Sequence, residues 1–131
     1  MTGTPNKTIL IVDDDPSVRE VLTGYFEHQY GPRGYSVETA SDGTQALAAV
    51  RRRRPALILL DIEMPGLDGV ETLRSVRALD PAIPVIMVTG NASTRVAGEA
   101  IKAGAYSYLP KPVRFQYLDH LAATVLGPAG G

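Results

Sequence analysis

The sequence of 131 residues has no cysteine, no excess of charge of either sign, and no long apolar run. Without cysteine there can be no disulfide, no thiol catalysis and no thiolate metal site, and the chain is compatible with a reducing compartment. Its 13 basic residues balance 14 acidic ones, so no global charge draws it to nucleic acid or an anionic membrane. No apolar stretch approaches the roughly 20 residues needed to cross a bilayer.

Motifs for several other kinds of chemistry are missing as well. The polar residues 1–7 do not resemble a signal peptide. There is no glycine-rich phosphate loop, no nucleophilic Ser-His pair and no aromatic motif for nucleic acids. We therefore expect one soluble, cytoplasmic domain, large enough to bury a core, with no direct contact to nucleic acid or membrane.

The chain does contain a fivefold alternation of short aliphatic runs with amphipathic segments, which is typical of a parallel α/β sheet. The predicted fold is a single doubly wound, flavodoxin-like, five-stranded parallel sheet of order 2-1-3-4-5 with five flanking helices. Residues 1–7 are predicted to be a loose N-terminus, 8–126 the domain, and 127–131 a tail or linker start. Strands are predicted over 8–12, 35–40, 56–60, 85–88 and 106–109. Helices are predicted from Pro16 onward and over 44–53, 68–78, 93–103 and 114–126.

Polar and charged residues stand at the carboxyl ends of the predicted strands. Asp13 and Asp14 follow the first strand, and Asp61 follows the wholly aliphatic run at 57–60. Thr89 and Lys111 follow the fourth and fifth strands. In a doubly wound sheet these ends share one rim, where open α/β sheets bind their ligands. A carboxylate buried alone there is costly, so we expect a cation, a hydrogen-bond network or a reaction to accompany it.

Three clustered carboxylates repel one another, and a hard divalent cation with oxygen ligands is the usual solution. Mg²⁺ typically uses one or two carboxylates together with waters and a phosphate oxygen. Lys111 would offset the remaining charge, and the Thr89 hydroxyl would add a neutral donor to a bound anion. This set suits the transfer of a phosphoryl group to a carboxylate, which attacks as the nucleophile. Because an acyl phosphate is labile, the modification would be transient.

The same residues lie in four stretches that together resemble the response-regulator receiver domain of two-component signalling. The stretches are ILIVDDDP at 9–16, LLDIEMPGLDG at 59–69, VTG at 88–90 and LPKP at 109–112. One motif would be a weak signal, but four in order at the right strand ends are specific. The resemblance covers about residues 8–126, and it implies that Asp61 accepts a phosphoryl group from a histidine kinase or a histidine phosphotransfer protein in a phosphorelay.

The resemblance also implies how the metal and the phosphoryl group would be held. Asp14 and Asp61 would bind Mg²⁺, or Mn²⁺ in its place, directly. Asp13 would act largely through water, and Glu63 would contribute its backbone carbonyl. By the same resemblance Lys111 would pair with the phosphoryl group.

A switch and its readout follow from the same resemblance. Thr89 would close on the phosphoryl group, and Tyr108 matches the family's aromatic switch position on the fifth strand. The surface made by the fourth helix, fifth strand and fifth helix would then change, for a downstream effector or a covalently linked output domain. Dimerisation through this surface is open. The Lys111–Pro112 peptide bond matches one that is commonly cis in the family.

Each assignment has a structural alternative. Asp13 and Asp14 could form a loop turn, and Thr89 could merely end a strand. Lys111 could be a solvated surface lysine, and Tyr108 could be an ordinary packing residue. Glu63 and Asn91, each two residues beyond a site residue, flank the expected phosphoryl pocket. We hypothesise that these two tune water access and thus the lifetime of the aspartyl phosphate.

Other conspicuous residues are interpreted as structural. Asp15 is predicted to cap a helix that begins at Pro16. The basic run at 51–54 is interpreted as the solvated end of the second helix, where the helix dipole favours positive charge. His28 and His120 are expected to be surface or packing residues. The stretch at 27–34 is several residues longer than the family's usual turn, which leaves the length of the first helix open.

Two other classes of function remain as alternatives. A phosphohydrolase with an aspartyl-phosphate intermediate would have a second catalytic aspartate two residues after Asp61, where this chain has Glu63. A phosphorylation-independent interaction module would not need the residues that the chemistry requires. We therefore expect a phosphoacceptor switch, not an enzyme beyond self-phosphorylation and autodephosphorylation.

Overall fold

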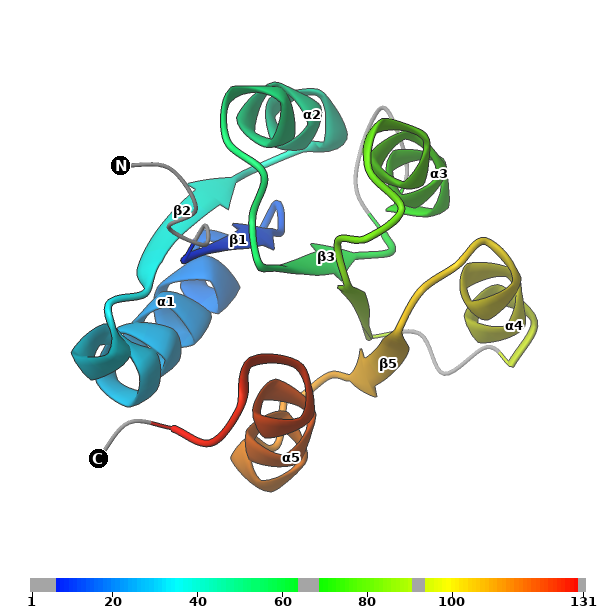
Figure 1. Ribbon diagram of the computed structural model, residues 1–131. Coiled ribbons are helices and arrows are strands. Elements are labelled where there is room, and N and C mark those ends of the chain that lie inside the picture. The colour runs from blue at the N-terminus through cyan, green and yellow to red at the C-terminus, as the bar shows by residue number, and fades with distance from the viewer. Residues whose placement is uncertain (1–6, 64–68, 91–93, 130–131) are drawn as a thin grey trace.

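The computed structural model describes residues 7–63, 69–90 and 94–129. Five parallel strands form one sheet in the predicted order, β2-β1-β3-β4-β5 (Figure 1). The strands are β1 (Thr8–Val12), β2 (Ser36–Ala40), β3 (Leu57–Asp61), β4 (Val85–Thr89) and β5 (Ser107–Pro110). The helices are α1 (Pro16–Tyr30), α2 (Gly43–Arg52), α3 (Gly69–Leu79), α4 (Thr94–Lys102) and α5 (Phe115–Leu126), with a short 3₁₀ turn, η1 (Gly31–Arg33).

The predicted elements agree with these bounds to within a few residues. Asp61 and Thr89 were expected just after their strands; instead they are the last residues of β3 and β4, because each still pairs with the neighbouring strand. Several predicted features lie outside the described residues. They are the N-terminal residues 1–6, the helix starts at Asp68 and Ser93, the tuning residue Asn91, and the final residues 130–131.

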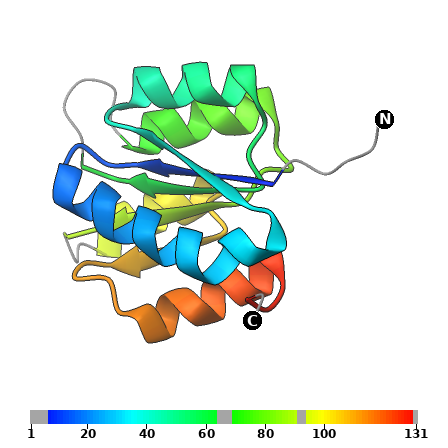
Figure 2. The same ribbon diagram turned by 90° about the vertical axis from the view of Figure 1, so that its left-hand side faces the viewer.

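The sheet lies between two layers of helices (Figures 1 and 2). Helices α2, α3 and α4 pack on one face, and α1 and α5 pack on the other. Strands β1, β3 and β4 are buried along their whole length, which explains their continuous aliphatic sequences. The edge strand β2 is largely half-exposed, as its alternating pattern predicted. No helix among the residues described here is long and apolar enough to span a membrane.

Helix α1 begins as predicted, and the structure gives its length, which the sequence left open. The Asp15 carboxylate accepts a hydrogen bond from the Ser17 N–H at 2.9 Å, and Pro16 occupies the first turn. At the other end, the long stretch at 27–34 forms no open loop. The helix continues to Tyr30, η1 follows, and Gly34 turns the chain with a φ of 90°.

The end of α1 contacts the chain where it leaves α5. Arg33 donates hydrogen bonds from Nη1 to the carbonyl oxygens of Leu126 at 2.9 Å and Pro128 at 2.7 Å. The Tyr30 hydroxyl donates to the Gly127 carbonyl at 3.1 Å. Three consecutive carbonyls at the end of α5 are thus satisfied by side chains from almost one hundred residues earlier.

Aromatic rings and a second cation complete this contact. The Arg33 guanidinium lies 6.0 Å from the ring centre of Tyr30 and 5.7 Å from that of Tyr35, within the range of cation–π attraction. Lys7 donates from Nζ to the Arg33 carbonyl at 2.8 Å. We call this set, Lys7, Tyr30, Arg33 and Tyr35 with the carbonyls of residues 126–128, the η1 corner. It lies where β1 and β2 begin, at the end of the sheet away from Asp61.

Candidate functional site

The sheet brings three carboxylates together at the carboxyl ends of its central strands. Asp13 directly follows β1, Asp61 ends β3, and the two strands are neighbours. Both side chains are buried, with 1% and 3% of their residue surface exposed, whereas Asp14 is exposed. One oxygen from each carboxylate lies within 4.8 Å of the others. We call these three residues with Lys111 the acid pocket.

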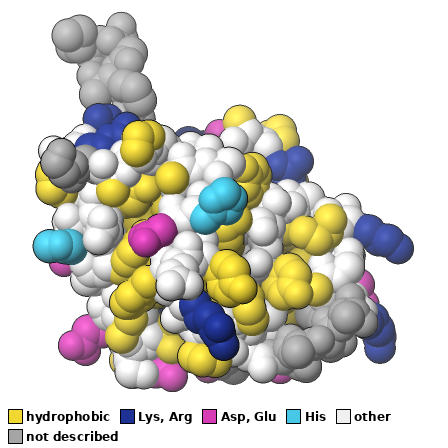
Figure 3. All heavy atoms as spheres, turned by 90° about the horizontal axis from the view of Figure 1, so that it is seen from below, with side chains coloured by type: hydrophobic (Ala, Val, Ile, Leu, Met, Phe, Trp, Pro, Cys, Tyr) yellow, Lys and Arg dark blue, Asp and Glu magenta, His cyan; other side chains and the backbone are white. Residues whose placement is uncertain are grey.

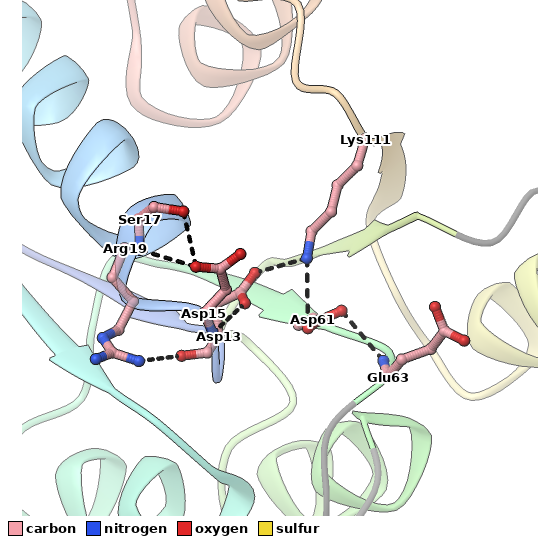
Figure 4. Close-up of polar contacts among 7 residues, drawn as sticks. All are labelled: Asp13, Asp15, Ser17, Arg19, Asp61, Glu63 and Lys111. Carbon is pink, nitrogen blue, oxygen red and sulfur yellow. Dashed lines mark hydrogen bonds and ion pairs between the residues drawn. The ribbon is translucent and has the colours of Figure 1, made fainter.

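Lys111 reaches the buried pair from the opposite side of the pocket. Its Nζ lies 3.0 Å from Oδ2 of Asp13 and 3.4 Å from Oδ2 of Asp61 (Figure 4). Its backbone N–H donates to the Thr89 carbonyl at 2.7 Å, and its bond to Pro112 is cis, as the resemblance implied. Partial burial lowers the pKa of Lys111, but its hydrogen bond to Asp13 and the charges of both aspartates outweigh this and raise it. The lysine is therefore a cation held within the pocket.

Asp61 is ionised less easily than an ordinary aspartate. Burial, followed by repulsion from Asp13, raises the pKa of Asp61 from 3.8 to about 6. The Glu63 N–H, which donates to Oδ1 at 3.1 Å, and Lys111 oppose that rise. At neutral pH the carboxylate is still mostly ionised, which is the form that can act as a nucleophile or a metal ligand.

The residues present fit a divalent cation. Three carboxylates and one ammonium leave two negative charges in excess, which one divalent ion would neutralise. Two oxygens bound directly to the same Mg²⁺ lie at most about 4.2 Å apart, so the Asp14 and Asp61 oxygens, which lie within 4.8 Å of each other, need to approach by no more than about 0.6 Å. Because Asp14 is exposed, such an ion could also keep waters. The oxygen-only donor set suits Mg²⁺ or Mn²⁺.

Four further residues were predicted for the site, and the structure describes three of them. Thr89 is buried at the end of β4, and its carbonyl accepts from Lys111. Glu63 is exposed and reaches Asp61 through its backbone N–H. Tyr108 lies on the edge strand β5 with 43% of its surface exposed, so it is not a core packing residue. Asn91 lies outside the described residues.

The residues interpreted as structural are exposed or cap a helix. The structure also shows contacts at the acid pocket that the sequence did not indicate. His28, His120 and the arginines at 51–54 are exposed, and Arg52 pairs with Glu38 at 3.1 Å. Asp15, besides capping α1, donates its backbone N–H to Asp13 Oδ1 at 2.9 Å. The sequence offered no signal for the hydrogen bond from Arg19 to the Asp13 carbonyl, or for the close contact of Gly69 with the end of β3.

An apolar groove runs from the acid pocket along α1. Lys111 and Ser17 are the polar residues that line the groove, and its other lining residues are apolar. Figure 3 shows the face of α1 and α5, where hydrophobic side chains lie between polar ones. Val21, with 52% of its surface exposed, contributes to this apolar surface. The groove is lined by Ser17, Val18, Val21, Leu22, Lys111, Pro112 and Val113.

Comparison with protein families gives one match over most of the chain. Residues 9–123 match the family model of the response regulator receiver domain. The transcriptional regulatory protein ZraR of Escherichia coli (strain K12) is 42% identical over 120 residues, which are 92% of this chain and 26% of that protein. The response regulator MprA of Mycobacterium leprae (strain TN) is 45% identical over 112 residues, 84% of this chain and 46% of MprA. The chain thus spans between about a quarter and a half of these curated relatives.

Solved structures agree with the fold. The receiver domain of NtrX from Brucella abortus has a TM-score of 0.81 and 35% identity, and the match covers 90% of this chain and 97% of that one. A CheY-like response regulator receiver domain protein from Methanospirillum hungatei JF-1 has a TM-score of 0.82 and 34% identity, covering 92% and 94% of the two chains.

Proposed function

This chain belongs to the response regulator receiver family, and from that premise we propose that Asp61 is the residue that accepts the phosphoryl group. Receiver domains of two-component response regulators act as signalling switches that histidine kinases phosphorylate on an aspartate, and the chain is such a domain. One observation carries the choice of site. A lysine ammonium lies between two buried carboxylates at the strand ends, with a third carboxylate beside them.

Asp61 suits the role of nucleophile better than Asp13. Asp13 is bound more closely, by the Asp15 N–H at 2.9 Å and by Lys111 at 3.0 Å, whereas the corresponding distances at Asp61 are 3.1 and 3.4 Å. In the transfer, an Asp61 oxygen forms a bond to phosphorus while the bond from phosphorus to the donor nitrogen breaks. The electron pair leaves with the imidazole of the donor histidine. Lys111 then has an anionic phosphoryl oxygen as a new partner.

Receiver domains bind Mg²⁺ at an acidic pocket, and the carboxylates of Asp13, Asp14 and Asp61 could hold a metal here. We assign direct binding to Asp14 and Asp61, a largely water-mediated role to Asp13, and a carbonyl ligand to Glu63. Mn²⁺ is the alternative ion. A bound cation supplies charge neutralisation for the phosphoryl oxygens.

The proposed switch runs from the phosphoryl group to the surface of α4, β5 and α5. Thr89 stands at the end of β4, next to the strand of Asp61, and it would donate its hydroxyl to the phosphoryl group. Tyr108 on the neighbouring β5 would then change its exposure, which makes that surface the readout. Glu63 and Asn91 remain our proposed tuning residues for the lifetime of the aspartyl phosphate.

Receiver domains interact with histidine kinases, and the partner's identity is part of the proposal. A histidine kinase or a histidine phosphotransfer protein would dock on the apolar groove beside Lys111, which ends at the acid pocket. The output would be a separate effector or a linked domain, since the curated relatives are longer than this chain. Homodimerisation through the α4, β5 and α5 surface and a cytoplasmic location complete the proposal.

The test is incubation with Mg²⁺ and acetyl phosphate, followed by intact mass. We expect one adduct of about 80 Da that disappears in Asp61→Asn and in the presence of EDTA. No adduct in the parent protein, or an adduct that survives Asp61→Asn, would overturn the assignment. A generic phosphate ester as substrate separates the switch from a phosphohydrolase, because only the latter would turn it over.

A further inference from the structure

Arg19 on α1 holds the backbone of Asp13 from outside the acid pocket. Its Nη1 donates a hydrogen bond to the Asp13 carbonyl oxygen at 2.7 Å (Figure 4). That carbonyl belongs to the peptide group that joins Asp13 to Asp14. The bond therefore fixes the orientation of this peptide plane. Because the exposed Asp14 side chain extends from it, the bond also fixes the direction of the third carboxylate.

Gly69, the first residue of α3, makes a comparable contact at β3. Its N–H donates to the Ile62 carbonyl at 2.9 Å. A β-carbon built on Gly69 would overlap the Asp61 carbonyl oxygen and would lie 2.8 Å from that of Ile62. These are backbone atoms, which cannot move aside as the end of a flexible side chain can. Any side chain at position 69 would therefore displace the segment that carries Asp61.

The acid pocket leaves little room for such displacements. One oxygen from each of its carboxylates lies within 4.8 Å of the others, and two oxygens bound directly to one Mg²⁺ lie at most about 4.2 Å apart. A shift of the Asp13–Asp14 peptide or of the Asp61 backbone by a fraction of an ångström would change that spacing. Partners that only orient metal ligands typically contribute about 10–100-fold to metal affinity or activity.

We propose that Arg19 and Gly69 are positioning residues. Arg19 holds the Asp13 carbonyl, while Gly69 holds the Ile62 carbonyl and lies against that of Asp61, so that the two residues set the spacing of the three carboxylates. Neither residue contacts the phosphoryl group. The segment that carries each buried carboxylate is thus held by the next helix along the chain, by α1 at Asp13 and by α3 at Ile62, next to Asp61. This inference rests on the proposed function of the acid pocket and extends it to residues outside it.

The first arm of the test compares Arg19→Ala with Arg52→Ala, which removes the same charge at an exposed position on α2. Calorimetry would measure the Mg²⁺ dissociation constant, and hydrogen exchange in the metal-free protein would follow the amides at 14–15. We expect Arg19→Ala to weaken Mg²⁺ binding about tenfold and to speed exchange at these amides. Arg52→Ala should change neither, and Arg19→Lys should recover part of the affinity. Equal effects of Arg19→Ala and Arg52→Ala would overturn the role of Arg19.

The second arm compares Gly69→Ala with Gly24→Ala. Gly24 is also helical, and a β-carbon there meets nothing within 4 Å, so this change should be neutral or slightly stabilising. We expect Gly69→Ala to weaken Mg²⁺ binding and to slow phosphorylation about tenfold or more. The buried Val76 on the same helix provides a control for stability alone. If Val76→Ala, with a comparable loss of stability, weakens Mg²⁺ binding as much, the role of Gly69 is contradicted.

The outcomes separate this inference from the proposed function. If the parent protein acquires no phosphoryl group, the function of Asp61 fails, while Mg²⁺ affinity and amide exchange still judge the positioning residues. If the parent is phosphorylated on Asp61 and neither Arg19→Ala nor Gly69→Ala alters Mg²⁺ binding or exchange, the positioning roles alone are refuted. Should Gly69→Ala fail to fold, the Arg19 comparison decides, because that side chain is only partly buried.

Discussion

The acid pocket and the η1 corner lie at opposite ends of the sheet, and both surround cations with oxygen atoms. At the η1 corner, Arg33 and Lys7 meet neutral carbonyl oxygens and aromatic rings. At the acid pocket, one ammonium group faces two buried carboxylates with a third nearby. The corner therefore places its cations against neutral groups, whereas the pocket concentrates more negative charge than its lysine can neutralise.

This difference indicates what each region does. Charge-assisted hydrogen bonds to neutral carbonyls stabilise the folded state. Buried carboxylates destabilise it unless a cation compensates, and the pKa of Asp61, raised first by burial and then by repulsion from Asp13, is a sign of that cost. We therefore expect substitutions in the pocket to alter chemistry most, and substitutions in the corner to alter stability alone.

The largest expected effect is the loss of the pocket's own cation. Lys111→Met should slow phosphorylation by acetyl phosphate about 100-fold, because a preorganised charge at the developing phosphoryl oxygens is lost. The rate would be followed by intact mass at saturating Mg²⁺. Lys102→Met, which removes an exposed lysine in the last turn of α4, is the control and should leave the rate unchanged. Similar rates for Lys111→Met and the parent would remove Lys111 from the chemistry.

The η1 corner should respond in stability. Arg33→Ala breaks two hydrogen bonds to carbonyls and two ring contacts, and we expect a loss of about 2–3 kcal/mol in the free energy of unfolding. Urea unfolding followed by circular dichroism would measure it, with the exposed Arg51→Ala as control. Phosphorylation should proceed at the parent rate. A loss of phosphorylation without a loss of stability would reverse the contrast between corner and pocket.

Removal of the Asp61 charge should stabilise the folded protein, whereas Arg33→Ala should destabilise it. Its raised pKa means that folding favours protonated Asp61, so its contribution is most favourable below pH 4 and is lost as the pH rises toward 6. Without metal at pH 7, Asp61→Asn should therefore stabilise the protein by about 2 kcal/mol, with little gain at pH 4. Urea unfolding at both pH values in EDTA gives the comparison. Destabilisation at pH 7 would show that Lys111 already compensates the charge fully.

The smallest expected effect comes from the loss of one hydrogen bond at the η1 corner. Tyr30→Phe removes only the hydroxyl that donates to the Gly127 carbonyl at 3.1 Å, and it keeps the ring under Arg33. We expect a loss of about 1 kcal/mol, less than for Arg33→Ala. Hydrogen exchange at the amides of Gly127 and Ala129 would report whether the chain after α5 loosens. If Tyr30→Phe costs as much as Arg33→Ala, the two residues act as one unit.

The elements and the acid pocket were predictable because both leave marks in local sequence. Strands buried on two faces are continuous aliphatic runs, and in a parallel sheet the residues that follow them meet at one rim. Asp13, Asp14, Asp61 and Lys111 could be placed together on this ground alone. The N-cap at Asp15 was equally local.

The remaining features depend on contacts that no local pattern records. Arg19 and Gly69 act on backbone atoms of Asp13 and Asp61, which have no side-chain signature. The η1 corner joins residues up to 97 positions apart, so the unusual length of 27–34 was visible but its partner was not. Whether a strand is buried on both faces can be read from its sequence, whereas the contacts that hold its ends are visible only in the folded structure.

The most direct test of the account locates the phosphoryl group itself. Borohydride reduction of the phosphorylated protein converts an aspartyl phosphate into homoserine, which peptide mass spectrometry assigns to a position. We predict homoserine at position 61 alone, in the parent protein and equally in Arg33→Ala. Homoserine at position 13 or 14, or no homoserine at all in protein that carries the phosphoryl group, would contradict the assignment of Asp61 as the phosphoryl acceptor.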